Sequence, residues 1–170
     1  MILCANEVSL RWHIILLLET INFMKSCFMF GHRDVPNGMQ EKIARAVERL
    51  YCEEGITSFY VGRYGEFDRI AGAAVRTVQT RFPEIMLFLL LPYHPAERPA
   101  VTPAGYDGTF YPPIEKVPRR YAIVKANQYM VSSCDAIICL AKHPGNSRKL
   151  LEYAQRIAKY QRLIIENIEL

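Results

Sequence analysis

The stretch from Ser26 to Gly62, SCFMFGHRDVPNGMQEKIARAVERLYCEEGITSFYVG, has the pattern of a strand, a helix and a second strand. Its apolar run at 26–30 is closed by a glycine, which predicts a buried strand. A second apolar run at 58–61 predicts another strand. Gly55 ends the helix expected between the two strands. The apolar residues of that helix recur at helical spacing and are Ile43, Val47, Leu50 and Tyr51.

The same alternation of strand and helix continues along the chain. A helix is expected to run to about Arg81, and further helices are expected over about 119–133 and 147–159. Continuous apolar runs predict strands at 85–91, 136–140 and 163–165. Strands that alternate with helices form parallel sheets. We therefore predict a three-layer, Rossmann-like α/β fold with about five parallel strands and helices on both faces, in a single domain over 24–170.

The segment 92–118 interrupts this pattern. It holds seven prolines together with Tyr93, Tyr106, Phe110 and Tyr111. Long loops are uncommon unless they have a function or are disordered, and disordered segments are poor in aromatic residues. The segment is therefore expected to be an ordered excursion or lid, with a merely structural loop as the alternative.

The N-terminal stretch 1–23 falls outside the expected domain. It is either an accessory helix or a mis-assigned start ahead of Met24. It lacks the features of a secretory signal, and its apolar run at 14–18 is too short to span a membrane. Its apolar character leaves a homodimer open.

Composition excludes disordered, collagen-like and coiled-coil proteins. The chain has 170 residues with 51% hydrophobic and 22% charged residues, which is ordinary globular usage. The net charge of +4 is small and spread along the chain, which disfavours nucleic acid as a partner. Five cysteines without a C-x-x-C pair favour a reducing, cytoplasmic setting and no metal site. No cofactor is predicted.

The candidate ligand site lies where the strands end. Ligands of open parallel sheets bind at the carboxyl ends of the strands. Four segments, 31–34, 62–68, 92–94 and 141–147, follow strands, and two of them carry glycines and lead directly into helices. Backbone N–H groups at a helix N-terminus attract anions, and Arg33, Arg63 and Lys142 add positive charge. These loops predict a phosphate-binding edge, although they match neither the Walker nor the dinucleotide-binding motif.

The sequence gives weaker support for catalytic residues than for ligand-binding residues. Glu66, Asp68 and Glu152 are carboxylates near the expected ligand edge, where Asp68 and Glu152 are the candidates for acid–base catalysis. Histidines follow three of the strands, without the spacing of a metal site. Ser147 and Cys134 lack the sequence context of a nucleophile.

The ordered motifs of the chain resemble the SLOG superfamily, in particular the small stand-alone YpsA-like proteins of bacteria. The resemblance covers about 25–165. The motifs that carry it are Gly31-His32-Arg33, Gly62-x-x-Gly65-x-Phe67-Asp68, Pro92-Tyr93-His94-Pro95, Tyr111-Pro112, Val117-Pro118-x-Arg120-Tyr121-Ala122-Ile123, Asn127-x-x-Met130, Ser133-x-Asp135 and Glu152-Tyr153-Ala154.

The resemblance implies a Rossmann-like sheet that binds a nucleotide or a nucleotide-derived molecule at its carboxyl edge. Its relatives include nucleoside-monophosphate phosphoribohydrolases, DNA-processing proteins and sensor domains. The chain departs from the family at Ala126, at Gly145-Asn146 and at Lys149 and Leu151, which weakens the implied enzyme activity. Together the loops and the resemblance give as ligand-binding candidates Gly31, His32, Arg33, Gly62, Arg63, Gly65, Phe67, Asp68, Asn127, His143, Gly145, Asn146 and Ser147.

Three functions follow as hypotheses. The leading one is binding of a nucleotide-like small molecule between the loops 62–68 and 143–147, with the segment 92–118 as a cover. The second is an N-glycosidic hydrolase acting on nucleoside monophosphates, in which Glu152 or Asp68 assists catalysis. The third is single-stranded DNA binding, which requires a basic groove with stacking aromatic residues.

Overall fold

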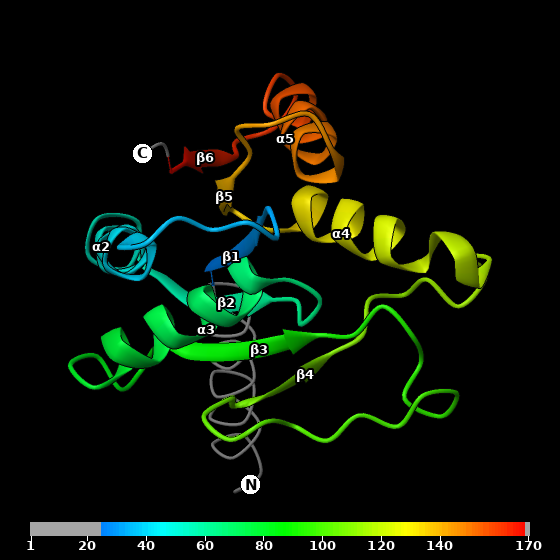
Figure 1. Cartoon of the computed structure of the whole chain (residues 1–170), viewed down its shortest axis with the longest axis horizontal. Helices are drawn as coiled ribbons and strands as arrows, with labels where there is room; N and C mark the ends of the chain where they lie inside the picture. Colours follow the sequence, from blue (N-terminus) through cyan, green and yellow to red (C-terminus); the bar gives the residue numbers. More distant parts are fainter. Residues whose placement is uncertain (1–24, 169–170) are drawn as a thin grey trace, which may run out of the picture.

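The computed structural model describes residues 25–168 and places its strands in one parallel sheet (Figure 1). The strands are β1 (Lys25–Gly31), β2 (Ile56–Val61), β3 (Met86–Leu90), β4 (Gly108–Phe110), β5 (Ala136–Leu140) and β6 (Ile164–Asn167). The helices are α2 (Met39–Glu54), α3 (Glu66–Gln79), α4 (Ala122–Ser133) and α5 (Asn146–Ile157), with a 3₁₀ turn at Arg119–Tyr121 before α4. The predicted α/β fold class is confirmed, with six strands described where about five were expected.

Strand β1 explains why both faces of the sheet are covered. Its residues from Cys27 to Phe30 are all buried. Side chains alternate between the two faces of a strand, so Cys27 and Met29 belong to the core under α2 and α3. Phe28 and Phe30 belong to the core on the other face, with residues of α4 and α5. The continuous apolar run therefore becomes a central strand between two helical layers.

The sheet order β4-β3-β2-β1-β5-β6 sets where a ligand can bind. From β1 the chain adds β2, β3 and β4 on one side, and it then crosses over to place β5 on the other side of β1. The strand order reverses between β1 and β5. All strands are parallel, so the loops after β1, β2, β3 and β5 lie along the same edge.

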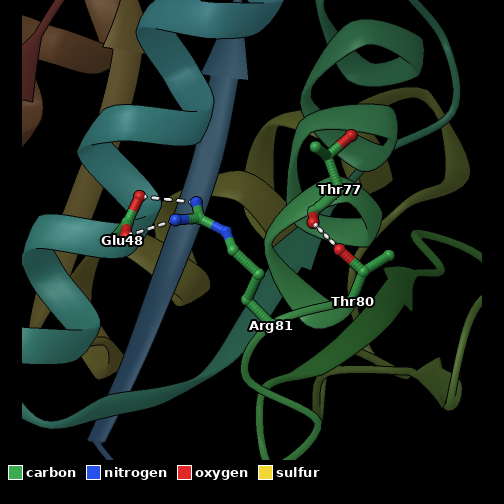
Figure 2. Close-up of polar contacts among 4 residues, drawn as sticks. All are labelled: Glu48, Thr77, Thr80 and Arg81. Carbon is green, nitrogen blue, oxygen red and sulfur yellow. Dashed lines mark hydrogen bonds and ion pairs between the residues drawn. The ribbon is translucent and has the colours of Figure 1, made fainter.

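Helices α2 and α3 pack side by side on one face of the sheet (Figure 1). An ion pair links α2 to the residues just after α3. The guanidinium of Arg81, just after α3, donates to both carboxylate oxygens of Glu48 on α2 at 2.8 and 2.7 Å (Figure 2). Beside it the Thr80 hydroxyl donates to the carbonyl of Thr77 at 2.7 Å (Figure 2). Gly55 ends α2 in a left-handed conformation, with φ of 70°. These contacts fix the ends of both helices.

The segment 92–118 contains a short strand that the sequence pattern did not indicate. Strand β4 pairs in parallel with β3 at one edge of the sheet. The Leu91 N–H donates to the Phe110 carbonyl at 2.8 Å, and the Asp107 N–H donates to the Leu87 carbonyl at 2.8 Å. The Asp107 carboxylate accepts in return from the Leu87 N–H at 2.7 Å. The segment is therefore attached to the sheet, and its part before β4 is held close to α3.

The expectations for residues 1–23 lie outside the described residues. Within residues 25–168, no helix is long and apolar enough to cross a membrane. The cysteines of this range, Cys27, Cys52, Cys134 and Cys139, are free thiols.

Candidate functional site

A cavity of about 710 Å³ lies between the loop after β2, helix α3 and the segment 103–106. The end of β1 and strand β3 complete its walls through Arg33 and Leu89. Four arginines from three separate parts of the chain line it, and we call it the arginine cavity. They are Arg33, Arg63, Arg69 and Arg76.

Arg33 and Arg63 supply positive charge at the end of the cavity nearest the N-terminus of α3. Both side chains are exposed, and neither forms an ion pair within residues 25–168. The Arg63 guanidinium lies 5.9 Å from the ring centroid of Tyr64. A phosphate group prefers such guanidinium groups because they donate two parallel hydrogen bonds. This end of the cavity is therefore suited to an anion.

Arg69 differs because its charge is balanced. Its guanidinium donates to both carboxylate oxygens of Glu66, one turn earlier on α3. The hydrogen bond from Arg69 lowers the pKa of Glu66, which keeps this carboxylate ionised. Both groups are exposed to solvent, so the pair contributes little to stability. Its effect is on the charge of the cavity, because the carboxylate of Glu66 neutralises the positive charge of Arg69.

The loop before α3 is closed by Asp68. Its Oδ2 accepts hydrogen bonds from the backbone N–H groups of Tyr64 at 2.9 Å and Gly65 at 3.2 Å. Burial raises the pKa of Asp68, although these two hydrogen bonds oppose the shift. The loop amides expected to bind a ligand phosphate are thus occupied by a carboxylate of the chain itself. Asp68 stabilises the helix start, and the amides of Tyr64 and Gly65 are not free to bind an anion in the cavity.

Arg76 and Tyr106 form the opposite end of the arginine cavity. The Tyr106 hydroxyl fits against α3 at Gly72, where a Cβ atom would lie only 2.5 Å from it. The Arg76 guanidinium lies 5.6 Å from the centroid of the Tyr106 ring. Gly105 has φ of +80° and leaves room for the stem of Arg76. Two glycines thus let the segment before β4 pack closely on α3.

Gly31 and Phe67, both predicted ligand residues, have packing roles. Phe67 is fully buried, and its ring occupies the space that a Cβ atom on Gly31 would need. Neither residue lines the arginine cavity. Gly31 therefore permits the first turn of α3 to approach the end of β1.

His32 and His143 meet where the strand order reverses. The backbone N–H of His143 donates to Nε2 of His32 at 3.0 Å, so this nitrogen carries no proton. Burial, and after it the proximity of His143, lowers the pKa of His32. The two rings are 5.6 Å apart. The predicted residues of the loop after β1 and the loop after β5 are thus joined to each other.

The loop after β5 does not reach the arginine cavity. Its predicted ligand residues, His143, Gly145, Asn146 and Ser147, are not among the lining residues. Gly145 precedes α5, and its carbonyl accepts the Lys149 N–H at 3.0 Å. The two glycine loops that the sequence placed around one ligand therefore border different regions of the carboxyl edge.

Asn127 and Glu152 also lie away from the cavity. Asn127 is a half-buried residue of α4, on the opposite face of the sheet from α3. Glu152 is exposed on α5 and forms an ion pair with Arg148 at 3.4 Å, one turn earlier. Neither lines the arginine cavity.

The described residues offer no prepared nucleophile at the cavity. Cys134 is buried at the end of α4, and burial raises the pKa of its thiol to about 12. A protonated thiol is a poor nucleophile. Among residues 25–168, no three His, Cys, Asp or Glu side chains are grouped so that they could hold a metal ion.

Several cavity residues were not singled out from the sequence. Arg69 and Arg76 are seven positions apart on α3, a spacing that places two side chains on the same face of a helix. That spacing was the available signal. The aromatic residues of the proline-rich segment, Tyr106 among them, were the signal that this segment has a role. Pro103 and Ala104 belong to no sequence motif that would have identified them. The predicted residues that do line the cavity are Arg33, Gly62, Arg63 and Gly65.

Comparison with known proteins adds no assignment. A scan against models of protein families and a search of curated proteins found no match. The resemblance to the SLOG superfamily therefore stays a prediction from the motifs.

Proposed function

We propose that the protein binds a nucleotide or a nucleotide-derived small molecule in the arginine cavity. One observation carries the proposal: four arginines from the end of β1, the loop after β2 and helix α3 converge on a single cavity of about 710 Å³. Small-molecule sites are clefts of roughly 300–1,000 Å³ with a few placed polar groups. The size of the cavity and its charge suit a phosphate-bearing ligand of nucleotide size.

The two ends of such a ligand have different partners. Arg33 and Arg63 are free of carboxylate partners within residues 25–168 and suit a phosphate. Leu89, Pro103 and the ring of Tyr106 offer apolar surface for a base or a sugar. The predicted resemblance to nucleotide-binding proteins agrees with this division.

We propose binding without a reaction for this cavity. Glu66 is the acidic residue among the lining residues, and both of its oxygens accept hydrogen bonds from Arg69. A carboxylate held in this way has an acid–base role only if the ion pair opens. Hydrolysis of a nucleoside monophosphate is tested by incubating a bound ligand with the protein and measuring release of the free base.

We also propose a cytoplasmic setting for this function. Cys27, Cys134 and Cys139 are buried as free thiols, and disulfides are rare in the reducing cytoplasm. The measurement is the oxidation state of these cysteines in protein taken directly from cells.

The binding proposal is tested with a panel of nucleoside mono- and diphosphates in thermal-shift measurements. A ligand at about 100 times its Kd adds roughly 2.7 kcal/mol of stability, which moves the Tm by several degrees. The shift is expected to fall strongly in Arg63→Ala and to persist in Arg45→Ala, an exposed arginine of α2 outside the cavity. An equal loss in both variants, or no shift with any nucleotide, would contradict the proposal.

A further inference from the structure

The arginine cavity is elongated along α3. Its lining residues on this helix run from Glu66, in the first turn, to Arg76, near the end. The Arg76 guanidinium reaches back along the helix to Gly72, where its Nη1 would lie 3.4 Å from a Cβ atom. At 1.5 Å per residue, Glu66 and Gly72 are about 9 Å apart along the helix axis. A single phosphate group spans only a small part of that length. The far end of the cavity therefore contacts a different part of any ligand bound at Arg33 and Arg63.

Unbalanced positive charge is present at both ends and is absent from the middle. Arg33 and Arg63 form no ion pair within the described chain, and the same is true of Arg76. Arg69 lies on α3 between Arg76 and the start of the helix, and its charge is neutralised by Glu66. The carboxylate of Asp68, on the same helix, accepts from the backbone of the loop before α3.

The charge of Arg76 is held in a fixed place. Its stem passes the backbone of Gly105, and its guanidinium lies against the ring of Tyr106. Tyr106 itself packs on α3 at Gly72. The carboxylate of the next residue, Asp107, accepts a hydrogen bond from the Leu87 N–H of β3. A cation held on a wall in this way is already positioned for a ligand, which reduces the entropy lost on binding.

The cavity also has an apolar wall. Leu89 is 1% exposed and belongs to β3, while Pro103 and Ala104 come from the segment before β4. A sugar or base is compatible with this surface, whereas a charged group there would lose hydration without gaining a partner.

We infer that the natural ligand carries two separated anionic groups, one held by Arg33 and Arg63 and the other by Arg76. Among nucleotides, this chemistry is that of a nucleoside bisphosphate, with phosphates on two positions of the nucleoside. The inference rests on the proposed function, because it assigns a ligand class to the same cavity.

The experiment compares adenosine 5′-monophosphate with adenosine 3′,5′-bisphosphate by isothermal titration calorimetry on the full chain. The bisphosphate is expected to bind at least tenfold more tightly, the order of one additional charge-assisted hydrogen-bonded contact. Arg76→Met keeps the aliphatic stem beside Gly105 and removes the charge. It is expected to abolish the tenfold gain, so that the bisphosphate and the monophosphate bind this variant with the same affinity. Arg63→Met is expected to weaken both probes.

The outcomes separate the two proposals. Equal affinity for the two probes, or a gain that persists in Arg76→Met, would overturn the inference and leave the proposed function standing. Failure of both nucleotides to bind the wild-type chain would overturn both. Arg76→Lys controls for folding, because it keeps the charge, and it is expected to retain part of the gain. If Arg76→Lys and Arg76→Met lose the gain equally while both stay folded by circular dichroism, the charge is not the cause and the inference fails.

Discussion

A Cβ atom on Gly62 would lie 2.8 Å from Oδ2 of Asp68. This contact explains the glycine that ends β2: the carboxylate that closes the loop before α3 occupies the space of a side chain. Gly65, three positions later, has extended backbone and no atom within 3.8 Å of its Cβ position. The two glycines of one motif therefore face different constraints.

Gly62→Ala is expected to destabilise the protein by about 1–3 kcal/mol, because the new methyl group displaces the Asp68 carboxylate from the loop amides. Gly65→Ala is the matched control and is expected to change stability by less than about 0.5 kcal/mol. Urea denaturation of the two variants measures both effects. Equal destabilisation by the two substitutions would show that the contact between Gly62 and Asp68 is not the constraint.

Asp68 is expected to give the stability a characteristic pH dependence. Burial raises its pKa in the folded protein, so the folded chain holds this proton more tightly than the unfolded chain does. The resulting stabilisation is complete below the unfolded pKa of about 3.9 and is lost as the pH rises through the higher folded pKa. Asp68→Asn retains an oxygen that can accept from the loop amides and does not titrate.

The measurement is the free energy of unfolding of wild-type and Asp68→Asn protein between about pH 3 and pH 7. As the pH rises, the free energy of unfolding of the wild type is expected to fall relative to that of Asp68→Asn. A difference that stays constant, or changes in favour of the wild type, contradicts the raised pKa of Asp68.

Gly72 and Tyr106 are expected to be coupled energetically. Alanine is favoured over glycine inside a helix by about 1 kcal/mol, but a Cβ atom on Gly72 would lie 2.5 Å from the Tyr106 hydroxyl. Gly72→Ala is therefore expected to destabilise the wild-type chain and to stabilise a Tyr106→Phe chain, which lacks that oxygen. A double-mutant cycle from thermal unfolding measures the coupling. Additive effects would mean that the hydroxyl is not seated at Gly72.

The described cysteines are expected to differ sharply in reactivity. Burial raises the pKa of Cys134 and of Cys139 to about 12, and Cys27 is fully buried. Cys52 is exposed on α2. Brief treatment of the native protein with iodoacetamide at neutral pH is expected to label Cys52 and to spare the other three, because the thiolate is the reactive form. Peptide mass spectrometry reads the positions, and labelling of Cys134 in the folded state would contradict its burial.

The fold was predictable because its strands are continuous apolar runs and its helices have clear apolar periodicity. Strand β4 was not predictable in the same way. It has only three residues, it begins with Gly108, and among residues 25–168 its one neighbouring strand is β3. An edge strand of this kind depends on pairing with its neighbour and on contacts such as the hydrogen bond from the Leu87 N–H to the Asp107 carboxylate. A local sequence pattern does not reveal such contacts.

The candidate site was predictable only in part. Rules for parallel sheets pointed to Arg33 and the loop after β2, which line the arginine cavity. They did not reveal that Asp68 occupies the loop amides, or that Tyr106 and Arg76 meet across Gly72. The same rules also grouped the loop after β5 with the loop after β2, whereas His143 contacts His32 and does not line the arginine cavity. These relationships depend on how segments distant in sequence pack together.

We propose above that a phosphate-bearing ligand binds in the arginine cavity. The most direct test is the map of backbone amide chemical-shift changes when adenosine 5′-monophosphate is added to isotope-labelled protein. We expect the largest changes at Tyr64, Gly65, Glu66 and Tyr106, which line the cavity. Changes centred on the loop 143–147, with none at these four residues, would contradict it and would move the site to the other glycine loop.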